Sequence, residues 1–309
     1  MGFFSSIGSV IGSVGRAIGS GISAVCSGIS SVVKSTIGTL SNLASKAVGT
    51  FISGIASKAA GFLKVFSGIM SGPLGPILGP IILDLAIKLV VKVVSKIAEE
   101  AKVVEKDEKP EEIGYRIEEA EKHEEFKRRE DFQNFKEYYS YLKEQIPIEE
   151  AENIKINQRR DFYSLLGMEA EIQALEEKFG IRIPRNALVE IGKSAMEVKE
   201  VQAFMRAFNN LGYSDLNISE YLKGTLPAGE LERITDAVLD ALKLYYPEKS
   251  ENLLLKRLNQ MRRVSEDDLQ IVEVYSDELR EEYGEKLNTA RQAGELPKET
   301  EKILDVVLK

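Results

Sequence analysis

The 309-residue chain is poor in the side chains that most enzymes use for chemistry. Cys26 is the only cysteine, His123 is the only histidine, and tryptophan is absent. A single cysteine excludes an intramolecular disulfide and a thiolate metal cluster. A single histidine leaves little scope for metal binding or acid–base catalysis. We therefore expect a protein that is not an enzyme, with no catalytic residue, no cofactor and no metal ion.

Acidic residues are absent before Asp84. The first 83 residues are mostly Gly, Ser, Ala, Ile and Val, and five cations give them a net charge of about +5. Because the whole chain carries -8, residues 84–309 carry about -13. An acidic body does not suit nucleic acid, which requires clustered Lys and Arg. A basic N-terminal segment is instead attracted to an anionic bilayer.

The N-terminus lacks the features of a secretory signal peptide, because Met1–Gly15 has no charged n-region. We expect a protein that is secreted or injected without a signal peptide and that acts at a target membrane. The start MGFFSS also fits the N-myristoylation pattern through Gly2 and Ser6, which has no meaning in a bacterial cytoplasm.

An apolar stripe recurs every three or four residues from Ile7 to Ile69, with a mean step of about 3.65 residues, close to the helical period. The opposite face is mostly Gly and Ser. Each interior Gly costs roughly 1 kcal/mol relative to Ala, so lipid, a partner or the body must stabilise such a helix. A flexible Gly/Ser linker is the alternative.

Four glycines at the start of this stripe have the spacing of a helix-association motif. Gly8 and Gly12 form one small-xxx-small step, and Gly15 and Gly19 form another. Missing side chains at this spacing let helix backbones approach closely in lipid. We expect these glycines to mediate self-association.

A helical hairpin follows in the sequence. The pattern over 47–70 is helical, the segment 71–80 is a strong helix stop, and 81–98 is again a dense apolar helix. Three prolines mark the expected turn: Pro73, Pro76 and Pro80. The side chains that we expect to enter a bilayer come from the stripe and from this second helix: Ile7, Ile11, Val14, Ile18, Ile22, Phe51, Ile55, Phe62, Phe66, Ile81, Leu85 and Leu89.

Three lysines form a row on the second helix of the hairpin, because Lys88, Lys92 and Lys96 recur every fourth residue. A helix surrounded by lipid would not tolerate this row at mid-depth. The row suits a helix that lies at the headgroups or lines a polar lumen. It equally suits a core helix of a soluble bundle whose lysines reach water.

The composition changes at 105–112, which we take as a charged boundary. Residues 1–104 form the expected membrane-active region, and 113–309 form an acidic body. Helical patterns cover the body over 111–145, 149–179, 185–211, 217–223, 228–245, 249–263, 265–292 and 298–308. The predicted fold is therefore all-α: Gly/Ser-rich amphipathic and hydrophobic helices with a hairpin, followed by an acidic multi-helix bundle.

Two motifs in the body resemble chemical sites without meeting their requirements. The segment ALVEIGKS ends like a phosphate-binding loop, but Ala187 replaces the first glycine and the segment is expected to be helical. The segment HEEFK begins like a zinc-binding helix, but Lys127 replaces the second histidine. We expect His123 to be a surface residue.

The segment MGFFSSIGSVIGSVGRAIGSGISAV resembles the glycine-zipper regions of bacterial membrane-disrupting effectors, including those carried by type VI secretion. The resemblance covers about the first hundred residues, is compositional and transfers no individual site residue. It implies depolarisation of a competitor's inner membrane and a cognate immunity protein.

These features predict a non-enzymatic, membrane-permeabilising antibacterial toxin whose N-terminal helices insert and associate in the target bilayer. The body would offer a docking surface to a delivery machine, a chaperone or the immunity protein. One alternative is a virus or phage structural protein with a membrane-penetration segment. Another is an architectural helical protein whose apolar stripe never meets lipid.

Replacing Gly8, Gly12, Gly15 and Gly19 together by Ile tests the association motif. We expect greater helicity of the N-terminal segment, because Ile has a better helix propensity than Gly, and a loss of dye release from anionic liposomes, because the backbones can no longer approach. Circular dichroism and a leakage assay measure the two effects. Unchanged leakage would exclude a role for these glycines.

Overall fold

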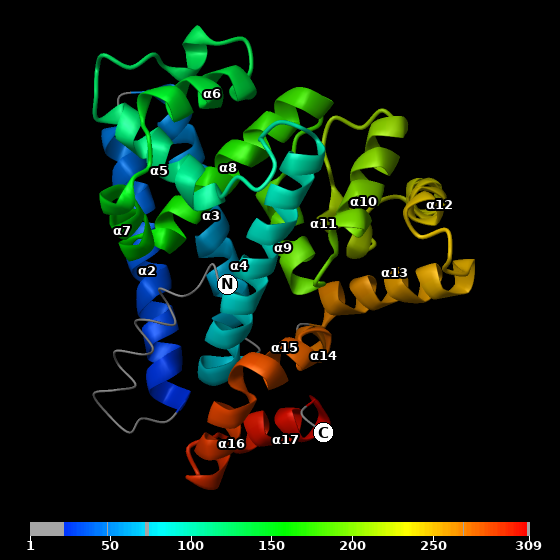
Figure 1. Cartoon of the computed structure of the whole chain (residues 1–309). Helices are drawn as coiled ribbons and strands as arrows, with labels where there is room; N and C mark the ends of the chain where they lie inside the picture. The colour runs from blue at the N-terminus through cyan, green and yellow to red at the C-terminus, as the bar shows by residue number, and fades with distance from the viewer. Residues whose placement is uncertain (1–21, 48, 72–73, 268, 308–309) are drawn as a thin grey trace. The chain divides into compact units, whose positions relative to one another are not determined.

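The computed structural model describes residues 22–47, 49–71, 74–267 and 269–307, and the regular structure in these ranges is helical (Figure 1). The predicted all-α class is therefore confirmed for the described ranges. Their one isolated β-bridge pairs Arg182 with Asp215, so the short segment around Ile181 serves as a connector between helices, as its length predicts.

The described helices fall into an N-terminal group and a longer series that follows. The first group consists of α2 (Ile22–Lys46), α3 (Thr50–Ser71) and α4 (Gly75–Glu100). The series up to the middle of the chain consists of α5 (Pro110–Glu121), η1 (Arg129–Asp131), α6 (Phe135–Gln145), α7 (Glu150–Gln158) and α8 (Arg160–Phe179). The remainder consists of α9 (Arg185–Lys193), α10 (Val198–Asn210), α11 (Ile218–Leu222), α12 (Ala228–Tyr245), α13 (Glu251–Glu266), α14 (Gln270–Val274), α15 (Ser276–Glu278), the π-helical turn η2 (Leu279–Tyr283), α16 (Gly284–Gln292) and α17 (Lys298–Val307).

Contacts within the chain divide it into two compact units. In the described ranges, unit 1 contains Ser31–Lys64 and Val91–Gly180, and unit 2 contains residues 22–30, Val65–Val90 and Ile181–Lys309 up to residue 307. Each of α2, α3 and α4 therefore contributes residues to both units. The functional division into 1–104 and 113–309 stays a prediction, and its N-terminal part does not coincide with either unit.

The connection between α3 and α4 is shorter than the predicted turn. Helix α4 begins at Gly75 rather than at Ile81, so Pro76 and Pro80 belong to the helix and their assignment to the turn is wrong. Proline is tolerated in the first turn, where its missing N–H has no intrahelical partner and its fixed φ suits the helix. Pro80 lies further inside and removes one backbone hydrogen bond. Pro73 lies outside the described residues.

Several long helices that the periodicity predicts are each divided into shorter ones. The predicted helix 111–145 stops at Glu121 and restarts at Phe135. The side chain of Asn134 accepts a hydrogen bond of 3.0 Å from the backbone N–H of Glu137, which satisfies a donor at the start of α6. The helices predicted over 149–179 and 185–211 are also each divided in two.

Aromatic side chains form part of the core of unit 1. The ring of Phe51 lies 5.9 Å from that of Tyr138, centroid to centroid, and 6.3 Å from that of Phe135. Phe135 also stacks on Tyr139 at 6.0 Å. Helix α6 therefore covers the start of α3 with aromatic surface.

Two glycines allow a close crossing of α5 and α8, which lie side by side in unit 1 (Figure 1). A Cβ atom on Gly114 would lie 2.0 Å from the carbonyl oxygen of Tyr163, and one on Gly167 would lie 1.9 Å from that of Pro110. Both neighbours are backbone atoms, which cannot rotate away. The glycines of α2 and α3 differ, because a Cβ on Gly61 would meet no atom within 4 Å.

The two kinds of glycine predict opposite effects of the same substitution. Gly114→Ala should lower the free energy of unfolding by about 3 kcal/mol or more, because it overpacks a backbone crossing. Gly61→Ala should raise it by about 1 kcal/mol, because alanine favours the helix and the site is open. Urea denaturation measures both. A similar effect of the two substitutions would contradict the close α5–α8 crossing.

Candidate functional site

Several residues of the predicted membrane site lie outside the described residues. They are Ile7, Gly8, Ile11, Gly12, Val14, Gly15, Ile18 and Gly19.

The described residues that we expect to enter lipid lie in the protein interior. Ile55, Phe62, Phe66 and Ile81 have no exposed surface, and Leu89 is half-buried. The remaining members are also buried: Ile22, Phe51 and Leu85. These side chains contribute to the cores of the two units, so contact with lipid would require them to leave these cores.

The lysine row divides into three different environments. Lys88 forms ion pairs, 2.9 Å to the carboxylate of Asp84 and 2.8 Å to that of Glu282. Lys96 pairs at 2.9 Å with Glu99 on the same helix. Lys92 is exposed. In this structure the row is therefore not a uniform line of cations facing one polar space, and Lys88 contributes to a cluster inside unit 2.

Asp84 is the centre of this cluster. Its Oδ2 accepts hydrogen bonds from the hydroxyl of Tyr283, at 2.7 Å, and from Nζ of Lys88, at 2.9 Å. Its side chain has no exposed surface, and Oδ1 has no hydrogen-bond partner among the described residues. Burial raises the pKa of Asp84 above its usual range, against the opposing charge of Lys88 and the Tyr283 hydrogen bond.

The sequence indicates half of this cluster. Asp84 and Lys88 stand four residues apart on a helix, in the order that favours an ion pair. Glu282 and Tyr283 follow almost two hundred residues later, as the separation of 199 residues between Tyr283 and Asp84 shows. No spacing rule connects residues so far apart, so their part in the cluster comes from the structure alone.

A second buried carboxylate meets α4 in unit 1. The hydroxyl of Ser95 donates a hydrogen bond of 2.8 Å to Oε2 of Glu171 on α8. Oε1 of Glu171 has no hydrogen-bond partner among the described residues. Burial, with smaller contributions from the charges of Glu111 and Glu108, raises the pKa of Glu171 to about 8.

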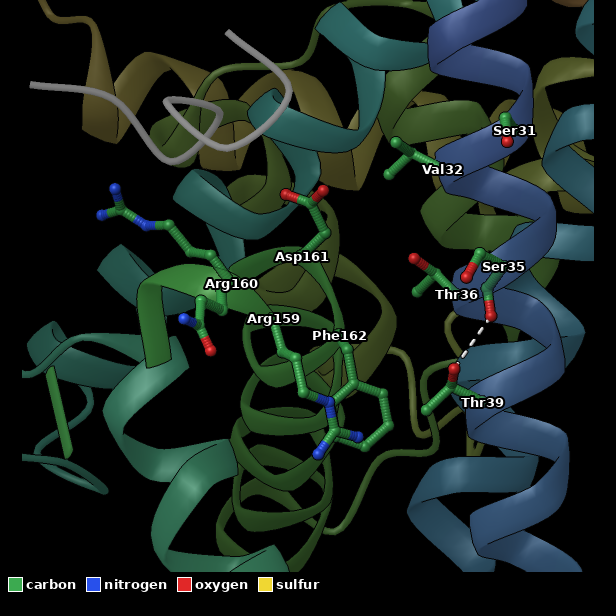
Figure 2. A pocket seen from close by; sticks show the side chains of 10 residues that line it. Ser31, Val32, Ser35, Thr36, Thr39, Arg159, Arg160, Asp161 and Phe162 are labelled. Carbon is green, nitrogen blue, oxygen red and sulfur yellow. Dashed lines mark hydrogen bonds between the residues drawn. The ribbon is translucent and has the colours of Figure 1, made fainter. Parts of the chain in front are cut away.

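A cavity of about 300 Å³ lies within unit 1 between α2 and the junction of α7 with α8. Figure 2 shows the side chains of Ser35, Thr36 and Thr39 on one wall and those of Arg159 and Phe162 on the other. The arginine is already engaged, because its Nη1 lies 3.0 Å and 3.2 Å from the carboxylate oxygens of Glu118.

The neighbouring Arg160 on the same wall donates a hydrogen bond of 3.0 Å from Nε to Glu111. Figure 2 also shows Asp161 on this wall. Both guanidinium groups are therefore compensated by carboxylates, and the cavity does not provide the uncompensated positive charge that an anion site requires.

The segments that resemble a phosphate-binding loop and a zinc-binding helix lie in a helix and at the surface, respectively. The segment from Ala187 to Lys193 is part of α9, and both Lys193 and Ser194 are buried. His123 is exposed beside Glu119 and Glu125, as expected for a surface histidine. Among the described residues, no group of three or more His, Cys, Asp or Glu side chains could hold a metal ion.

The buried Glu171 predicts a pH dependence of stability. Because the folded chain holds this proton more tightly, the contribution of Glu171 to the free energy of unfolding is largest below its ordinary pKa of 4.5 and falls as the pH rises to about 8. Glu171→Gln should flatten this slope and stabilise the protein by up to about 4 kcal/mol at the alkaline end.

Urea denaturation across this pH range measures the effect, and Glu124→Gln, at an exposed position of the same unit, is the matched control. The control should retain the slope of the wild type. If Glu171→Gln also retained it, Glu171 could not be the group that titrates.

In the part of the chain that the structure describes, none of the helices has both the length and the apolar character needed to cross a bilayer. Comparisons with protein-family models, curated proteins and solved structures give no match to this chain.

Proposed function

We propose that this protein is a non-enzymatic toxin that permeabilises membranes. Its acid-free N-terminal helices would act on an anionic bilayer by inserting as an assembly of associated helices. In the folded chain, the two units would hold these helices in a storage form whose apolar sides are covered. The resemblance of the N-terminus to glycine-zipper effectors adds support for an antibacterial role.

One observation carries this proposal: the side chains with a lipid-compatible pattern are buried, while the cations of the same helices reach the surface. Phe62 and Phe66 of α3 are buried, but Lys64 between them is exposed. Lys34 of α2 and Lys92 of α4 are exposed as well. Such an arrangement lets basic side chains meet anionic headgroups while the apolar surface is still protected.

The glycines of α2 and α3 add a second argument. Gly54, Gly61 and Gly68 of α3, like Gly28 and Gly38 of α2, have open space where a Cβ would lie. Each lowers helix stability by about 1 kcal/mol relative to Ala, and the folded chain gains no close packing from it. Association of helices in lipid is a state that would use these small residues.

The partners that this function requires follow from its chemistry. A target bilayer rich in anionic lipid would attract the exposed lysines. A delivery machine or chaperone would carry the storage form. An immunity protein would protect the producing cell.

Binding to vesicles tests the proposal. Lys34→Ala combined with Lys92→Ala should weaken binding to vesicles of phosphatidylglycerol and phosphatidylcholine about thirtyfold, because each lysine near an anionic surface contributes about 1 kcal/mol. The effect should disappear in vesicles of phosphatidylcholine alone. Co-sedimentation measures the affinity, and release of an enclosed dye measures permeabilisation.

Lys256→Ala is the matched control, because Lys256 is also exposed but belongs to α13 in unit 2. It should leave binding close to that of the wild type. The absence of both binding and dye release for the wild type, at micromolar protein, would exclude this function.

A further inference from the structure

We propose that Glu282 and Tyr283 of η2 form a polar clasp that holds residues 75–90 of α4 within unit 2, and that opening this clasp is the step that frees this part of α4. This inference rests on the proposed function for its biological meaning, but the clasp itself is a property of the folded protein. The name clasp refers here to these two side chains.

The cluster around Asp84 divides into a part that belongs to α4 and a part that does not. The ion pair between Asp84 and Lys88 lies within α4, at 2.9 Å. Two contacts from η2 reach this pair: the hydrogen bond from Tyr283 to Asp84, at 2.7 Å, and the ion pair between Glu282 and Lys88, at 2.8 Å. The two clasp contacts therefore reach both charged residues of the α4 pair.

This division matters because of the cost of an uncompensated charge. A carboxylate that leaves the protein interior for an apolar environment is costly unless a cation accompanies it. Asp84 keeps a compensating cation when α4 moves, because Lys88 lies one turn further along the same helix. This order of acid and base favours an ion pair. Helix α4 can therefore separate from η2 with the charge of Asp84 still balanced by Lys88.

The clasp is partly exposed to water. Such exposure is required of a contact that opens to release α4. The side chain of Asp84 has no exposed surface, whereas those of Lys88 and Glu282 are 23% and 44% exposed. Tyr283 is buried, so the clasp joins an accessible ion pair to an enclosed hydrogen bond. The ion pair is screened by water and salt, so it is the weaker contact of the two.

The backbone of the clasp is unusual. Residues 279–283 form a π-helical turn, a conformation that is rare and often found at functional positions. In an α-helix, adjacent side chains point to different faces. The wider π turn reduces the angle between Glu282 and Tyr283, which allows both to reach α4. Leu279, at the start of the turn, is fully buried and anchors it in unit 2.

Hydrogen exchange in the absence of lipid tests the clasp directly. The double variant Glu282→Gln, Tyr283→Phe removes one charge and one hydroxyl and keeps the shape of both side chains. We expect amide exchange of residues 75–90 to become about tenfold faster, because a charge-assisted hydrogen bond and an ion pair no longer oppose local opening. Exchange in α10, which belongs to the same unit, should not change.

Glu281→Gln is the matched control, because Glu281 is exposed on the same turn and its substitution also removes one negative charge. It should leave exchange of residues 75–90 as in the wild type. Unchanged exchange in the double variant would overturn the clasp. Equal acceleration in α10 would also overturn it, because the effect would then be a general loss of stability.

Dye release from phosphatidylglycerol vesicles connects the clasp to function. The double variant should release dye about tenfold faster than the wild type, in proportion to the larger open population. Release at the wild-type rate, despite faster exchange, would exclude the clasp as the controlling step. If neither protein releases dye, the proposed function fails, while hydrogen exchange still decides whether the clasp exists.

Discussion

The structure depends on covering the apolar sides of three helices, whose charged residues are almost all lysines. Between residues 22 and 98 the only carboxylate is Asp84, and the outer faces of α2 and α3 are made of small residues and a few lysines. Burial of apolar surface, worth about 25 cal/mol per Å², is then the main contribution that can hold these helices in the fold. Glycine-rich faces add little, because they bring neither side-chain packing nor strong helix propensity.

Two kinds of contact, aromatic and polar, cover different parts of α2, α3 and α4. Helix α6 covers Phe51 with aromatic rings, whereas Glu171 and the clasp meet α4 through polar groups at Ser95, Asp84 and Lys88. Apolar packing supplies most of the stabilisation but has little directional preference. The buried polar contacts are directional, so they fix the rotation of α4 about its axis.

The sequence predicts the helical class and the apolar sides of α2–α4, because both follow from a local period. It does not predict the breaks at Asn134 and Arg159, because residues with good helix propensity continue through both positions. At Asn134 a cap signal is present, with Glu137 three residues later, but a cap competes with the surrounding helical pattern and tertiary contacts decide between them. At Pro76 the error is of another kind, since a proline near a helix start is compatible with the helix.

The candidate site, too, can be predicted only in part from the sequence. A period can identify the pair of Asp84 and Lys88, but the choice of Glu282 and Tyr283 as partners depends on which distant helix the chain brings to α4. The structural role of a helical glycine likewise depends on its tertiary neighbours. Gly114 and Gly61 both lie within helices. Only Gly114 faces a neighbouring backbone that leaves no room for a side chain.

The buried carboxylates also bear on what could release α4. Burial raises the pKa values of Asp84, Glu171 and Glu190, so the folded chain binds these three protons more tightly than the unfolded chain does. Acidification therefore stabilises the fold at these groups, and a fall in pH would not free α4 through them. Competition for the exposed half of the clasp is a different route. An anionic surface that attracts Lys88 away from Glu282 would weaken the accessible contact first and leave Tyr283 alone to hold Asp84. The exposed position of this ion pair favours contact with an anionic target as the trigger.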